Sequence, residues 1–311
     1  MGPAATEPPP HPESRRIGHL AQLFGFAQFE FAGTLAVPDG RYLARGEGGD
    51  ERQRVLVVAT VGAPPPTARR RRRPKPAAAG EEPAPLPLTR ATAVRAYEPF
   101  ETTEEAARWL TATIGSAETV EALLGEGIGL LNRALHAQAA ASADPHGAET
   151  RPERAVAVRI GYGEGEEVAA GRFAEAQRID ARGGSGPRRR QREEELRPQE
   201  RLAAVLGGRE RIDACETPLL RARADLDAGR RREAALQLRI ALEAMLVELA
   251  GALADPGHEE DMATLETRRN EAGEAANLAL RGDLDDAQER SVRELVETAE
   301  RVLRRRRVLR G

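Results

Sequence analysis

The sequence contains almost no lysine. Lys75 is the only lysine among 47 basic residues, so arginine carries nearly all of the positive charge. A Walker A loop needs a lysine after its glycines, and a protein kinase needs one to pair with the ATP phosphates. Pyridoxal enzymes and Schiff-base aldolases use a lysine nucleophile. Lys75 lies in "RRRRRPKPAAAG", which has no apolar periodicity that could fix its geometry, so these classes are excluded.

Cysteine and histidine are also scarce. Cys215 is the single cysteine and accompanies five scattered histidines, whereas structural zinc sites combine several of both at short spacings. "HEED" at His258 lacks the second histidine of HExxH. We expect Cys215 to be a small buried thiol rather than a nucleophile served by His136 or His146. The sequence therefore predicts no catalytic residue, no metal and no cofactor.

Aromatic residues and long apolar runs are rare as well. Aromatics make up 3% of the chain, so its cores must be built from alanine, leucine and valine. The longest apolar run, residues 55–63 apart from Thr60 and Gly62, is too short to cross a bilayer. No secretory hydrophobic segment follows Met1, and one cysteine allows no intrachain disulfide. We expect a cytoplasmic protein that does not enter a membrane.

What is present indicates two domains in 311 residues. Residues 1–14 are polar and proline-rich, which predicts a disordered tail. Residues 15–181 predict an α+β domain, interrupted at 62–88 by a Pro/Arg-rich insertion that lacks the apolar pattern of a core. Residues 182–195 read as a linker, and residues 196–311 as a helical bundle. The predicted fold class is α+β, with a mixed, largely antiparallel sheet and helices followed by a C-terminal helical-hairpin bundle.

Several patterns carry the prediction for the first domain. Strands are predicted at 26–37, 54–61, 89–96 and 155–160 from alternation or short apolar runs. In the first of these, one face is apolar and the other polar: Phe29, Phe31, Leu35 and Val37 against Gln28, Glu30 and Thr34. Thr102 and Glu105 have capping-box spacing and open a helix whose apolar face is Ala106, Trp109, Leu110 and Ile114. A second helix is predicted from Ile128 to Ala141.

The second domain shows two amphipathic stretches. In the first, Leu236, Ile240, Ala244 and Val247 form a stripe, which Leu238, Leu242, Met245 and Leu249 widen into a broad face predicted to be buried. The second predicted buried face is made of Val292, Leu295, Val296, Ala299, Val302 and Leu303. Gly229 and Gly282 each stand between two helical patterns, as glycines that end helices do.

The stretch "AVAVRIGYGEGEEVAAGRF" raises the question of a phosphate-binding loop. Gly161, Gly163 and Gly165 follow an apolar run, but the dinucleotide fingerprint GxGxxG requires a glycine or alanine where Glu166 stands. Three glutamates nearby, including Glu164 and Glu167, would repel a pyrophosphate by about 4 kcal/mol per contact at 4 Å. We therefore interpret the stretch as a strand-to-helix turn and keep the phosphate loop as the alternative.

Arginine clusters at 69–73, 188–192 and 304–310 suggest a different partner. Phosphate contacts are possible for Arg69, Arg70, Arg71, Arg72, Arg73 and Lys75. No aromatic residues interleave with them to stack bases, and the formal net charge is −3. We prefer to interpret these runs as solvated linkers or frayed helix ends.

Three segments carry a resemblance. "VRIGYGEGEEVAAGRF", "LRPQERLAAVLGGRE" and "GRRREAALQLRIALEAM" are similar to segments of uncharacterised proteins from GC-rich bacteria, over roughly the second half of the chain. No established activity, fold or binding site belongs to that group, so the resemblance implies no functional residue.

The favoured hypothesis is a non-enzymatic interaction or regulatory protein whose helical domain binds a protein partner or self-associates. The first alternative is association with nucleic acid or ribosomes through the arginine clusters. The second alternative is an enzyme or small-molecule binder with a site between the domains.

Overall fold

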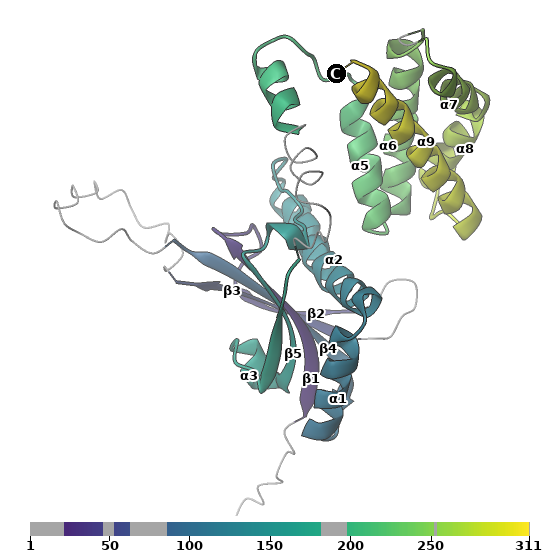
Figure 1. The fold of residues 1–311 in the computed structure, drawn as a ribbon. Coiled ribbons are helices and arrows are strands. Elements are labelled where there is room, and N and C mark those ends of the chain that lie inside the picture. Colours follow the sequence, from purple (N-terminus) through teal and green to yellow (C-terminus); the bar gives the residue numbers. More distant parts are fainter. Residues whose placement is uncertain (1–21, 46–52, 63–85, 182–197, 252–253, 311) are drawn as a thin grey trace, which may run out of the picture. The chain divides into compact units, whose positions relative to one another are not determined.

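The computed structural model describes residues 22–45, 53–62, 86–181, 198–251 and 254–310 (Figure 1). The chain divides into two compact units, Met1–Gly183 and Gly184–Gly311. The first is a β-sheet with helices and the second is helical, so the fold is α+β, as predicted. The predicted disordered tail and the predicted linker lie outside the described residues, and so does most of the predicted insertion. The insertion ends earlier than predicted, because Leu88 already begins a strand.

The first unit contains one six-stranded sheet. Its strands are β1 (Leu23–Ala32), β2 (Gly40–Ala44), β3 (Arg54–Val61), β4 (Leu88–Phe100), β5 (Ala157–Glu164) and β6 (Glu175–Ile179). They are ordered β2-β3-β4-β1-β5-β6, and every ladder between them is antiparallel. The strand predicted at 54–61 is confirmed as β3, which lies between β2 and β4 and buries Leu56, Val57 and Val58.

Two helices cover one face of this sheet, α1 (Thr103–Ile114) and α2 (Ala117–Ser142). The predicted capping box of α1 is confirmed at Thr102, whose side chain accepts a hydrogen bond from the Glu105 N–H at 3.1 Å. The predicted apolar face of α1 is also confirmed, since all four of its residues lie in or against the core. In α2, a Cβ on Gly127 would lie 3.0 Å from the Phe29 ring, so glycine lets this helix approach β1 closely.

Three predictions for the first unit need correction. The strand predicted at 26–37 is β1 and ends at Ala32. Gln28, on its predicted polar face, is a buried polar residue and is 2% exposed. The helix predicted to begin at Ile128 begins at Ala117, where the Ser116 side chain accepts a hydrogen bond from the Thr119 N–H. The strand predicted at 155–160 is β5 and continues to Glu164.

The opposite face of the sheet carries less cover. The short helix α3 (Gly165–Ala169) places Val168 against Phe26 and Val94 on this face. The hydrogen bond from Arg90 to the Ala170 carbonyl (3.1 Å) holds the end of this segment over β4. A single turn of 3₁₀ helix, Pro152–Arg154, precedes β5.

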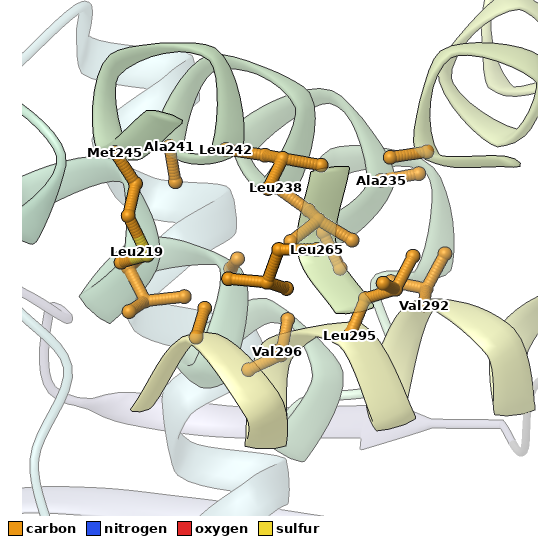
Figure 2. Close-up of a cluster of buried hydrophobic side chains, with 14 of the residues drawn as sticks. Leu219, Ala235, Leu238, Ala241, Leu242, Met245, Leu265, Val292, Leu295 and Val296 are labelled. Atoms are coloured by element: carbon orange, nitrogen blue, oxygen red, sulfur yellow. The ribbon is translucent and has the colours of Figure 1, made fainter. Parts of the chain in front are cut away.

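The second unit is a helical bundle. Residues 198–206 are helical, and α5 (Glu216–Asp227), α6 (Arg231–Glu248), α7 (Pro256–Thr267), α8 (Arg269–Ala279) and α9 (Asp286–Arg310) follow. Gly229 has φ = +73° between α5 and α6, and Gly282 follows α8, which confirms both as glycines beyond a helix end. Leucine, alanine and valine side chains of α5, α6 and α9 meet in the core (Figure 2). Over the described residues, no helix combines the length and apolar character that a membrane crossing requires.

Candidate interaction surface

Helix α6 has two apolar faces. The first lies in the core, where Ala234, Ala235, Leu238, Ala241, Leu242, Met245 and Leu249 are each 0–1% exposed. The predicted contribution of Leu238, Leu242, Met245 and Leu249 to a buried face is thereby confirmed. The three alanines extend this face, and they allow α5 and α8 to pack closely against α6.

The second apolar face of α6 is partly open to solvent, although Leu236 and Ala244 on it pack against the edge of the core. We call Leu236, Ile240, Ala244 and Val247 the outer stripe, because their spacing places them together on one side of the helix. Ile240 is 58% exposed and Val247 is 80% exposed, while Leu236 and Ala244 are half-buried. The prediction that this stripe is buried in the bundle is wrong for Ile240 and Val247.

The residues beside the outer stripe are polar, and hydrogen bonds with residues of α8 hold their side chains. Arg239 donates to Asn277 Oδ1 at 3.1 Å, and Arg269 donates to Glu243 Oε1 at 3.0 Å. This hydrogen bond and the charge of Arg269 hold the pKa of Glu243 below its usual range, so its carboxylate is ionised at neutral pH. Arg239 and Glu243 therefore form a charged border along one side of the stripe.

Another exposed apolar residue lies at the end of α8. Arg232 donates to the carbonyl of Ala279 at 2.7 Å, which places the end of α8 beside the first turn of α6. The next residue, Leu280, is 66% exposed. The sequence carries no signal for Leu280, because its position beside α6 depends on the packing of α8.

The C-terminal arginine run has partners within the bundle. Arg305 lies 3.6 Å from Asp255 Oδ1 and 3.4 Å from Asp261 Oδ2, and Arg306 pairs with Asp213. Arg307 lies 3.0 Å from Glu216 Oε2. These arginines lie within α9, so the run is not frayed here. It remains solvated at Arg305 and Arg307, whose side chains are 44% and 50% exposed. The residues at 69–73, Lys75 and the cluster at 188–192 lie outside the described residues.

The glycine stretch is mainly strand. Gly161 and Gly163 lie inside β5, buried and paired with β1, and Gly165 begins α3. The interpretation of the whole stretch as a turn is wrong for Gly161 and Gly163. A loop that wraps a phosphate is not formed either, because the two glycines are held in the middle of the sheet.

The candidate nucleophile is unsuited to that role. Cys215 is 0% exposed, and burial together with a hydrogen bond to Glu248 raises the pKa of its thiol to about 12. The two histidines considered with it, His136 and His146, are exposed residues of the first unit. Among the described residues, no group of three or more His, Cys, Asp or Glu side chains is arranged to hold a metal ion.

Comparison of the chain with protein-family models, with curated proteins and with solved structures finds no match.

Proposed function

We propose that this is a non-enzymatic interaction protein whose helical unit self-associates through the outer stripe of α6. The observation that carries the proposal is the second apolar face of this helix, with Ile240 and Val247 in solvent. A helix that is apolar on opposite sides is typical of a helix covered on both sides. The bundle covers one side and part of the other, and a second copy of the chain would cover the exposed Ile240 and Val247.

The spacing of the stripe suits an antiparallel pair of identical helices. If the two-fold axis passes near residues 241 and 242, Leu236 faces Val247 of the partner subunit and Ile240 faces the partner subunit's Ala244. Arg239 then lies opposite Glu243 of the partner subunit, and the same contact recurs on the other side of the axis. This is the self-complementarity that a two-fold interface requires. Opposite charges beside the apolar contact favour this register over a shifted one.

The expected contact is small. Helix α6 has 18 residues, which corresponds to a length of about 27 Å at 1.5 Å per residue. One helix pair of this length falls at or below the size of standard interfaces, so we expect a dissociation constant on the order of micromolar.

Sedimentation velocity of the full chain over a range of concentrations tests the proposal. We expect a monomer–dimer equilibrium, which Ile240→Arg should shift to monomer because the two new charges would have to be buried in the contact. Leu220→Arg is the matched control, since Leu220 is 66% exposed on α5 and lies outside the stripe. A monomer at all concentrations, or a dimer that Ile240→Arg leaves intact, would overturn the proposal.

A further inference from the structure

On the sheet face that carries α3, a row of polar side chains crosses four strands. Thr92, Gln28, Arg159 and Arg178 stand directly opposite one another on β4, β1, β5 and β6. Gln28 donates to Thr92 Oγ1 at 3.1 Å, and Arg159 donates to Gln28 Oε1 at 3.2 Å. Gln28 and Thr92 are 2% and 1% exposed, so hydrogen bonds satisfy the buried part of the row.

The row ends in two arginines that face each other. Residues directly opposite on antiparallel strands share a face, and like charges in such a pair are destabilising. Glu30 offsets the charge of Arg159, because its carboxylate lies 2.9 Å from Arg159 Nη1. Arg178 lies on the edge strand β6, at the exposed end of the row.

A hollow adjoins the end of the row. The β5–β6 ladder ends at the pair Val158 and Ile179, and the two strands separate beyond it. The hollow left there has a volume of about 520 Å³ and is lined by residues 155–158 and 178–181. This is within the range of small-molecule sites. Arg178 lies in the lining, is exposed, and donates to the Val156 carbonyl at 3.1 Å, which holds its guanidinium beside the hollow.

We propose that Arg178 binds the oxyanion group of a small molecule that occupies this hollow. A guanidinium group has five N–H donors in a planar arrangement that matches a carboxylate or a phosphate. The hydrogen bond of Arg178 to the Val156 carbonyl uses one nitrogen, so donors remain for a ligand. An anion beside Arg178 would also offset its repulsion with Arg159, which stands directly opposite on β5. This proposal is independent of self-association through α6.

The test is an NMR titration of the full chain with inorganic phosphate and, separately, with acetate at constant ionic strength. We expect saturable shifts of the backbone amides of residues 156–159 and 176–179, with a dissociation constant on the order of millimolar for so small a probe. Saturation by phosphate alone points to a phosphate ester as the ligand, and saturation by acetate to a carboxylic acid.

Three variants decide whether the hollow is the site. Arg178→Gln should weaken binding at least about 5-fold, because it removes the guanidinium group in the lining of the hollow. Asp180→Asn should tighten it, because this change removes a carboxylate from the lining. Arg172→Gln is the charge-matched control, since Arg172, which follows α3, is exposed and pairs with Glu167. Shifts that do not saturate, or equal weakening by Arg172→Gln and Arg178→Gln, would overturn the proposal.

Discussion

Gly161 lies in β5 at a point where a side chain would run into the backbone of β6. A Cβ at this position would collide with the carbonyl of Glu175 and with Ala176. The sequence pattern around Gly161 suggested a nucleotide loop or a turn, but close approach of two strands is a sufficient reason for this glycine. The information was missing from the sequence because the approaching strand lies more than ten residues further along the chain.

The prediction for this residue is that Gly161→Ala lowers the free energy of unfolding of the first unit by about 1–2 kcal/mol, since the strands must move apart. Urea unfolding followed by Trp109 fluorescence measures it. Gly129→Ala is the matched control. No atom lies within 4 Å of the Cβ it would add in α2, so we expect about 0.5–1 kcal/mol of stabilisation there. Equal effects of the two substitutions would show that the contact with β6 is unimportant.

At the scale of elements, a buried carboxylate joins three helices of the second unit. Glu216, at the start of α5, is 4% exposed. It accepts hydrogen bonds from Arg201 of the helix at 198–206 at 2.6 and 2.8 Å, and from Arg307 of α9 at 3.0 Å. Burial opposes the ionisation of Glu216, but the two arginines outweigh it, so the pKa of this carboxyl is below its ordinary value. The ionised form therefore stabilises the fold.

We predict that Glu216→Gln lowers the free energy of unfolding by about 2–4 kcal/mol at pH 7, because two guanidinium groups lose a buried partner. A carboxyl with a lowered pKa stabilises above its unfolded-state pKa and loses this effect as the pH falls through its folded-state pKa. The difference between wild type and variant should therefore narrow below pH 4.5, the ordinary value for glutamate.

Urea unfolding followed by circular dichroism at pH 7 and in acid measures this difference. Glu210→Gln is the control, since Glu210 also binds Arg201 at 2.7 Å but has a side chain that is 43% exposed. An exposed pair of this kind contributes about 0–1 kcal/mol. A Glu216→Gln difference that stays constant in acid would contradict the assigned role of the carboxylate.

Helix α6 shows how far periodicity determines an element. It predicted the helix and four of its core residues, because leucine and methionine at these spacings form one face. Periodicity assigned the outer stripe to the core as well, because the stripe has the same spacing as a buried face. In the structure, alanines at 234, 235 and 241 complete the buried face. Which of two apolar faces is buried depends on the neighbouring helices, and a single helix pattern contains no information on them.

The predicted beginnings of helices α1 and α2 also depend on whether a local signal is present. The beginning of α1 was predicted because Thr102 and Glu105 form a local capping motif. The beginning of α2 was placed eleven residues too late, because Gly125 and Gly127 lower helix propensity, while packing of the helix on the sheet retains them in it. A strong local motif predicts where a helix begins. Where local signals are weak, tertiary packing determines the boundary.

At the scale of the molecule, the two units have separate cores of different composition. Every aromatic residue precedes residue 184, and the core of the second unit consists of alanine, leucine, valine, one methionine and Cys215. The sequence predicted the fold class because this change in composition coincides with a change from strand to helix patterns. The order of the strands was not predictable, because β1 pairs with β4 and β5 across long stretches of chain.

The separate cores lead to the last prediction, which is that the two units unfold independently. Trp109 is the only tryptophan and belongs to the first core, so its fluorescence reports that unit alone, whereas circular dichroism at 222 nm reports the helices of both. In thermal unfolding of the full chain we expect two transitions, because transitions that coincide for different probes are the signature of a single cooperative unit.

A fragment of residues 184–311 should reproduce the transition that tryptophan fluorescence does not detect, with a midpoint within about 2 °C. Self-association through α6 would raise this transition alone as the protein concentration increases. Coincident transitions, together with an unfolded fragment, would show that the helical unit depends on the first unit for its stability.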